Sequence, residues 1–282
     1  MKSNMRKKTM KTSALLLCTL ALAATVLGAC SDGKEAQVLK PIDQHITGRW
    51  KLTQCLELKD GKWVEDPLEG EDGMLSTYCA DGTLIVTNVD PDGKAAMHTT
   101  SWSADDEQRT LTNGECVTQL LRLTADELQM AYHLSADEET GELREGEFRW
   151  LMTRVDQEPL TLAESLLGRW LYVSTYEKKN GQWTECSYGR PDEGWHRYQP
   201  DGTATSYSRV GDKEHTGTMK WTVNQLTGTV VCTNPENEAQ FSTMQAELEG
   251  DDTLNMFYSK NFDPATGQAI EGEFKDVLKR VE

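Results

Sequence analysis

The chain has 282 residues and a formal net charge of −17, from 46 Asp and Glu against 29 Lys and Arg. Five of the basic residues and none of the acids fall within residues 1–29, so the rest of the chain carries −22. Such an acidic chain, with no basic block after its leader, is a poor candidate for binding nucleic acid or an anionic membrane surface. Its apolar content of 37% is low, yet eight Trp and eight Tyr argue against disorder and predict small hydrophobic cores.

The chain begins with a leader over residues 1–29. A basic segment, Met1–Lys11, precedes the apolar segment Ser13–Ala29, an order that is typical of a secretory signal peptide. The sequence Leu27-Gly28-Ala29-Cys30 resembles the bacterial lipobox, which implies that Cys30 is acylated and becomes the new N-terminus. The alternative is a transmembrane anchor, for which the apolar segment is at the short limit of length.

Acylation of Cys30 would anchor the protein to a lipid membrane, because each buried CH₂ group contributes about 0.8 kcal/mol. Ser31 follows Cys30, where Asp would resemble an inner-membrane retention signal of some bacteria, so we expect the outer membrane. The sequence leaves open whether the protein faces the surface or the periplasm. Residues 30–45 are expected to comprise the lipidated Cys30 and a flexible tether, since residues 31–43 are polar and lack periodicity.

The rest of the chain is a tandem repeat. Six blocks recur in the same order at offsets of 119 to 126 residues, among them Gly48-Arg49-Trp50 as Gly168-Arg169-Trp170 and Glu145–Phe148 as Glu271–Phe274. Similarity over this length indicates duplicated domains and not a solenoid, whose repeats are about 20–50 residues long. We therefore expect one domain over 46–157, a linker over 158–165 and a second domain over 166–282.

Each copy is predicted to be all-β. Asp-Gly or Asn-Gly pairs, which favour type I′ hairpin turns, occur at 60–61, 81–82, 92–93, 113–114, 180–181 and 201–202. Short runs rich in Thr, Val, Tyr and Trp lie between them, and turns every 8–12 residues suggest a sandwich or an up-and-down barrel. In the last strand of the second copy, alternation places Phe274, Leu278 and Arg280 on one face. A helix is expected only over 162–167.

The succession Gly-x-Trp, Asp-Gly-Thr, Thr/Ser-x-Trp, Leu-x-x-Tyr and a closing Arg-Val resembles the small lipocalin-like domains of bacterial lipoproteins. The resemblance implies two tandem antiparallel up-and-down barrels after a lipoprotein signal peptide. It also implies that an Arg packs across a Trp where each barrel closes, pairing Trp50 with Arg154 and Trp170 with Arg280. These four residues would have a structural role, because a guanidinium over an indole contributes about 0.5–2 kcal/mol and ties the first strand to the last.

Five cysteines remain for an oxidising compartment once the leader is removed and Cys30 is acylated. Cys186 and Cys232 form the simplest disulfide, since they are the two in the second copy. In the first copy Cys116 is expected to pair with Cys55 or Cys79. Neither Cys/His spacing nor the acidic clusters match a metal-ligand pattern, so we expect no metal and no cofactor.

Catalytic motifs are not found in the sequence. His45, His98, His133, His196 and His215 are scattered, and none lies in a zinc-protease motif or beside a nucleophile elbow. The two copies share Trp, Gly and Arg, which are residues of architecture. We expect that the protein is not an enzyme.

The sequence therefore predicts a membrane-anchored lipoprotein whose barrels bind a small apolar or amphiphilic ligand. The alternative is a non-catalytic scaffold of the outer membrane, with filled barrels that display an aromatic patch to an unknown envelope protein. Candidates for that patch are Tyr188, Trp195, Tyr198 and Tyr207, which we interpret rather as core. The amount of space inside each barrel distinguishes the two hypotheses.

Overall fold

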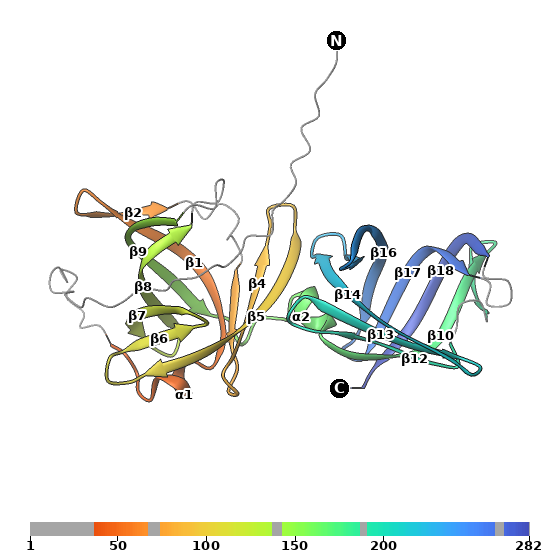
Figure 1. The fold of residues 1–282 in the computed structure, drawn as a ribbon, viewed down its shortest axis with the longest axis horizontal. Helices are drawn as coiled ribbons and strands as arrows, with labels where there is room; N and C mark the ends of the chain where they lie inside the picture. Colours follow the sequence, from red (N-terminus) through yellow and green to blue (C-terminus); the bar gives the residue numbers. More distant parts are fainter. Residues whose placement is uncertain (1–36, 67–73, 137–142, 187–190, 263–267, 282) are drawn as a thin grey trace, which may run out of the picture. The chain divides into compact units, whose positions relative to one another are not determined.

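The protein is built almost entirely from antiparallel strands (Figure 1). The computed structural model describes residues 37–66, 74–136, 143–186, 191–262 and 268–281. These residues form eighteen strands and two five-residue helices. The predicted all-β fold class is therefore confirmed.

The first repeat contributes one helix and nine strands. They are α1 (Ile42–Ile46), β1 (Gly48–Lys59), β2 (Lys62–Asp66), β3 (Leu75–Tyr78), β4 (Thr83–Val89), β5 (Lys94–Asp105), β6 (Thr110–Asn113), β7 (Cys116–Leu123), β8 (Glu127–Ala136) and β9 (Leu143–Arg154).

The second repeat has the same order of elements. They are α2 (Leu162–Leu166), β10 (Gly168–Lys179), β11 (Gln182–Cys186), β12 (Glu193–Tyr198), β13 (Thr203–Val210), β14 (Lys213–Asn224), β15 (Thr229–Asn234), β16 (Asn237–Glu249), β17 (Thr253–Phe262) and β18 (Ala269–Arg280).

The strands of the second repeat close into a barrel. Each strand from β12 to β18 pairs antiparallel with the next, and β18 returns to pair with β10 through Trp170↔Arg280 to Glu177↔Phe274. On its other edge, β10 pairs with β12 through its first residues and with β11 through its last ones. The result is a closed antiparallel barrel with eight strand positions around its circumference.

The described pairings of the first repeat follow the same plan. Strand β1 pairs with β3 and β2, β3 pairs with β4, and the strands from β5 to β9 pair in sequence order. Residues of the two repeats that share a sequence block therefore occupy corresponding strand positions.

The chain divides into two compact units whose bounds differ from those of the repeats. The first unit comprises Met1–Thr47, Thr53–Glu69 and Ser101–Arg154, and the second comprises Gly48–Leu52, Gly70–Thr100 and Val155–Glu282. Within the second unit, β5 pairs with β14 through Val223↔Ala95 and Asn224↔Lys94. Part of the first repeat is thus packed in the same unit as the whole second repeat.

Two of the predicted hairpins show directly why the chain turns where it does. Asp60 and Gly61 between β1 and β2 have φ of 52° and 75°, and Asn180 and Gly181 between β10 and β11 have φ of 50° and 79°. A type I′ turn needs positive φ at both central residues, which Asp, Asn and Gly tolerate best.

Each repeat has a short helix before its first strand. Helix α2 begins with a capping box, in which Thr161 and Glu164 satisfy each other's backbone N–H groups, and it lies where the sequence predicts a helix. Helix α1 lies largely within the segment expected to be a flexible tether. Its Ile42 and Ile46 are fully buried, so the ordered chain begins before Gly48.

The core of the second unit lies at the end of the barrel beside α2. It includes Trp170, which is fully buried and donates its indole N–H to the carbonyl of Leu166 at 2.8 Å. The main members of this apolar cluster are Leu166, Trp170, Tyr198, Trp221, Val223, Val230, Leu254, Met256 and Leu278, together with Ala95 and Met97 of β5. This end of the barrel is filled by side chains.

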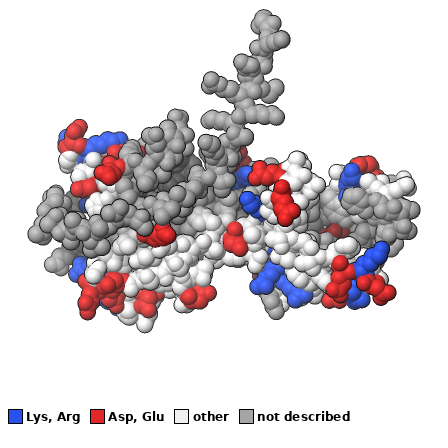
Figure 2. Space-filling view, in the orientation of Figure 1, with Lys and Arg blue, Asp and Glu red and all other residues white. Residues whose placement is uncertain are grey.

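Charged side chains are dispersed over the surface. On the face drawn in Figure 2, acidic and basic side chains of the described residues are interspersed and separated by uncharged surface.

Candidate binding site in the second barrel

The structure brings Trp170 and Arg280 together at the seam of the second barrel. The guanidinium carbon of Arg280 lies 4.2 Å from the centre of the Trp170 ring. Arg280 donates from Nε to the carbonyl of Asp251 at 2.9 Å, from Nη1 to that of Leu167 at 2.5 Å, and from Nη2 to that of Ser165. The side chain therefore ties β18 to the turn before β17 and to the end of α2.

Arg154 makes the corresponding set of bonds in the first repeat. It donates from Nε to Ala125 at 2.6 Å, from Nη1 to Thr47 at 2.9 Å, and from Nη2 to His45, in each case to a backbone carbonyl. Trp50 is fully buried like Trp170 and belongs to the second compact unit, whereas Arg154 belongs to the first, and their pairing stays a prediction. These arginines have carbonyl partners and hold the architecture, so they are not candidates for ligand contact.

The interior of the second barrel becomes polar away from α2. Asp276 on β18 pairs in register with Thr175 on β10 and with Met256 on β17. Its Oδ1 accepts hydrogen bonds from the Thr175 hydroxyl at 2.7 Å and from the Tyr258 hydroxyl at 2.9 Å, and Asn261 donates to the Tyr258 oxygen at 3.2 Å. Asp276 is only 8% exposed, and Thr175 is 1% exposed. A carboxyl group is thus held inside the barrel by neutral donors.

Burial changes the acidity of this carboxyl group. Desolvation raises the pKa of Asp276 from its ordinary value of 3.8 to about 6, and the hydrogen bonds from Thr175 and Tyr258 oppose this rise. Desolvation, followed by the charge of Asp276, raises the pKa of both Tyr258 and Tyr172. At neutral pH the site is therefore a buried carboxylate surrounded by protonated hydroxyls.

A second polar pair lies inside the barrel between β10 and β12. The Tyr172 hydroxyl and the His196 Nε2 are joined by a hydrogen bond of 2.5 Å, with ring centres 5.1 Å apart. Burial lowers the pKa of His196 from 6.5 to about 4, so its imidazole is neutral at neutral pH. Both side chains are partly buried, and Tyr172 also packs against the apolar cluster near α2.

A groove lies along β14, β15 and β16 of the same barrel. It has a volume of about 560 Å³ and is lined by residues of β14, β15 and β16, including Gly217, Met219, Cys232 and the 65% exposed Phe241. Cys232 is buried and interacts electrostatically with Tyr172, and desolvation raises the pKa of its thiol to about 12. Cys232 thus lines the groove, belongs to the apolar cluster and lies near Tyr172.

The polar interior distinguishes the second repeat from the first. Met130 pairs with Trp150 in the same way as Met256 pairs with Asp276, so an indole stands in the first repeat where the second has a carboxyl. The Trp150 ring lies edge-on to Tyr132, with ring centres 5.1 Å apart.

The neighbouring positions differ too. At offsets of 120 and 126 residues, Thr175 and Tyr258 correspond to Cys55 and Tyr132, whose Sγ and hydroxyl oxygen are 3.3 Å apart. At the offset of 120, Tyr172 and His196 correspond to Leu52 and Ser76. The candidate site is therefore a feature of the second barrel alone.

Sequence analysis missed Asp276, His196 and Tyr172 as site residues, because they are not shared between the copies. One signal could have found Asp276: it occupies the position between Phe274 and Leu278, two residues that alternation already places on the inner face. An acid at an inward position of a strand is unusual and deserves a functional interpretation.

No disulfide joins the cysteines among the described residues. Cys186 lies at the end of β11 and pairs in register with Thr175, while Cys232 on β15 pairs in register with Trp221 and Ser242. The disulfide between them, like those proposed for Cys55, Cys79 and Cys116, stays a prediction. Cys30, the expected lipidation site, lies outside the described residues.

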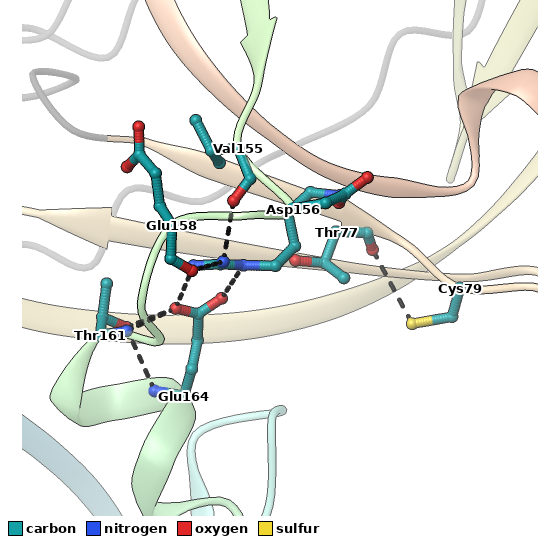
Figure 3. Close-up of polar contacts among 8 residues, drawn as sticks. Thr77, Cys79, Val155, Asp156, Glu158, Thr161 and Glu164 are labelled. Atoms are coloured by element: carbon teal, nitrogen blue, oxygen red, sulfur yellow. Dashed lines mark hydrogen bonds and ion pairs between the residues drawn. The ribbon is translucent and has the colours of Figure 1, made fainter. Parts of the chain in front are cut away.

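Arg49 forms a further polar cluster, in the second unit (Figure 3). Its guanidinium makes two 2.8 Å bonds to the Glu164 carboxylate, with the two side chains 12% and 9% exposed. It also donates to the carbonyls of Val155 at 3.0 Å and Glu158 at 2.9 Å. Glu164 is the residue that completes the capping box of α2, so this cluster fixes the linker and is structural.

The close-up also contains Cys79, whose thiol lies 3.9 Å from the Thr77 carbonyl (Figure 3). Burial and the nearby charge of Asp81 raise the pKa of this thiol. A thiol that is kept protonated in this way is a weak nucleophile.

Part of the expected aromatic patch lies on the outer face. Trp195 and Tyr207 stack with ring centres 5.8 Å apart, and the Arg169 guanidinium lies 4.7 Å from the Trp195 ring. Tyr198 is instead buried in the core, and Tyr188 lies outside the described residues.

The described residues contain no cluster of three or more His, Cys, Asp or Glu side chains that could hold a metal ion. Within the same residues, no helix has the length and apolar character needed to cross a membrane.

Comparison with known proteins yields little. No protein-family model matches the chain, and no curated protein matches it at a significant level. A solved structure from Bacteroides fragilis, provisionally described as an outer membrane protein, is 12% identical over 85% of this chain and 99% of its own, with a TM-score of 0.23. At that identity and TM-score, the similarity supports no statement about the fold or function of this protein.

Proposed function

We propose that the protein is a lipid-anchored lipoprotein of the bacterial outer membrane whose second barrel binds a small amphiphilic molecule. The observation that carries the proposal is the division of the barrel interior. One end is filled by the apolar cluster around Trp170, and polar side chains line the other, beside a groove of about 560 Å³. Ligand sites in proteins commonly combine apolar walls with a few buried polar groups in this way.

The anchoring part of the proposal rests on the leader and on its resemblance to a lipobox at Leu27-Gly28-Ala29-Cys30. The lipocalin-like assignment rests on the motifs of each repeat, and the Arg280–Trp170 contact supports it for the second. The ligand is small because the groove offers a few hundred Å³, the lower part of the range found for ligand pockets.

We propose binding and not catalysis. Burial lowers the pKa of His196 to about 4, which makes its imidazole a weak general base at neutral pH, and its Nε2 is bonded to the Tyr172 hydroxyl. The alternative function is a scaffold, for which the outer face with Trp195, Tyr207 and Arg169 would provide the contact surface.

Native mass spectrometry of the full chain, purified from the membranes of its own host, tests the proposal. We expect a second species that is heavier by the mass of one small molecule and disappears when the protein is unfolded. Purification in two detergents of different mass identifies detergent adducts, because the added mass of such an adduct would change with the detergent, whereas that of a bound ligand would not. A single apo mass in both detergents would contradict ligand binding and favour the scaffold.

A further inference from the structure

The carboxyl group inside the second barrel has no positive partner among the described residues. Its bonds come from the hydroxyls of Thr175 and Tyr258, and none of the ion pairs formed by described residues includes Asp276. A buried carboxylate without a cation is unfavourable, because hydrogen bonds from neutral groups replace only part of its hydration. Buried titratable groups of this kind occur preferentially at functional sites.

The titratable groups around Asp276 do not supply a positive charge at neutral pH. Burial raises the pKa of the Tyr172 and Tyr258 hydroxyls and of the Cys232 thiol, and it lowers the pKa of His196 to about 4. Glu177, two positions after Thr175 on β10, already pairs with Lys179 at 2.9 Å. Among the described residues, none therefore supplies the positive charge that would complete the site.

We propose that Asp276 makes the second barrel selective for an amphiphile whose polar end is a primary ammonium group. The ammonium would donate to the Asp276 carboxylate, and the alkyl part would lie along Met219, which lines the groove. Charge-assisted bonds of this kind are about twice as strong as neutral ones. The inference rests on the proposed function and names the chemical class of its ligand.

The difference between the two repeats predicts which of them binds the ammonium ligand. The first repeat carries Trp150 in place of Asp276, so its interior has no corresponding acceptor for an ammonium group. One ammonium ligand per chain is therefore expected.

Proton linkage gives a second signature. Binding of the ammonium requires the ionised form of Asp276, so the affinity should be constant above the carboxyl pKa of about 6 and fall about tenfold per pH unit below it. An alcohol with the same alkyl chain should bind with little dependence on pH.

Isothermal titration calorimetry with octylamine, octanol and octanoate tests the inference. The protein is the full chain with Cys30→Ala, which prevents acylation and leaves every described residue unchanged. We expect octylamine to bind at least about tenfold more tightly than octanol at neutral pH, and octanoate to bind more weakly than either. In Asp276→Asn, octylamine and octanol should bind with similar affinity.

Glu273→Gln is the matched control, since it removes one carboxylate from the same strand at a side chain that is 67% exposed. It should leave the preference for octylamine unchanged. Equal binding of octylamine and octanol to the parent chain, or a preference that survives Asp276→Asn, would overturn the inference and leave the proposed function standing. If none of the three compounds binds, the inference is overturned, and the native mass spectrum decides separately whether the proposed function stands.

Discussion

Asp276 is the residue at which function and stability are expected to conflict. Its pKa in the folded chain is about 6, above the ordinary 3.8, so the folded state holds the proton more tightly than the unfolded state. The stability contributed by the protonated group is fully present below pH 3.8 and is lost as the pH rises through about 6. A shift of about two pKa units corresponds to roughly 3 kcal/mol.

Asp276→Asn should therefore stabilise the unliganded protein at neutral pH by up to about 3 kcal/mol, since the amide cannot ionise and still accepts from Thr175 and Tyr258. The gain should shrink to nearly zero at pH values below 3.8. Urea unfolding of both proteins at the two pH values measures this difference. A variant that is less stable than the parent at neutral pH would show that the buried carboxylate is not a strained group.

The residue scale also shows what a sequence reveals about a site. Trp170 and Arg280 can be identified because a second copy carries the same pair of residue types. Asp276 and His196 occur in one copy only, so internal comparison treats them as background. Their role depends on burial and on partners from other strands, such as Tyr172 from β10 against His196 from β12.

At the scale of elements, one arginine at the end of each repeat holds several segments together. Arg280→Ala should destabilise the protein by about 2–4 kcal/mol, because three carbonyls lose a charged donor and the Trp170 ring loses its cation. Arg280→Lys should recover only part of this loss, since one ammonium cannot reach all three carbonyls.

Urea unfolding followed by tryptophan fluorescence measures these changes. Arg209→Ala is the control, because Arg209 is 40% exposed and pairs with an exposed Glu193 at 3.1 Å, so its removal should change stability by less than about 1 kcal/mol. A loss for Arg280→Ala no larger than that for Arg209→Ala would contradict the structural role of the seam.

The linker cluster makes a second prediction for an element. Arg49→Ala should cost about 3–5 kcal/mol, because it leaves the Glu164 carboxylate nearly buried without its cation. Combining it with Glu164→Ala should cost less than the two single changes added together. A double-mutant cycle by urea unfolding measures this coupling, and additive losses would show that the pair does not stabilise the linker.

Arg169→Ala provides the comparison at the corresponding position of the second repeat. There the guanidinium lies over the Trp195 ring, so the expected loss is about 1 kcal/mol.

Individual turns and helix starts could be predicted from local sequence rules, but the segments that they pack against could not. Asp60-Gly61 and Asn180-Gly181 fix two hairpins through their own backbone preferences, and Thr161 with Glu164 fixes the start of α2. The burial of Ile42 and Ile46 in α1 depends on distant strands, which is why that segment was assigned to a tether.

At the scale of the whole molecule, the sequence repeats and the compact units divide the chain at different residues. The repeats are read from residues such as Gly48-Arg49-Trp50, whereas β5 residues Ala95 and Met97 belong to the core cluster of the second unit. A repeat in sequence reflects the history of the chain, and contacts depend on where hydrophobic side chains are finally buried.

Membrane anchoring is a prediction for the whole molecule that depends on one residue. Cys30→Ala should abolish labelling of the protein by radioactive palmitate, because the acylated side chain is lost. Cys55→Ala is the control and should stay membrane-bound and labelled. A parent chain that is not labelled, or a Cys30→Ala chain that is labelled as strongly as the parent, would contradict acylation at Cys30 and favour the transmembrane anchor.

The central claim is that the interior of the second barrel receives an ammonium amphiphile at Asp276. The most direct test is a crystal structure of the Cys30→Ala chain grown with octylamine. The account predicts the ammonium nitrogen within hydrogen-bond distance of the Asp276 carboxylate, with the alkyl chain running past Cys232 toward Met219. Octylamine bound only on the outer face, or a barrel interior closed over by side chains without it, would contradict the account.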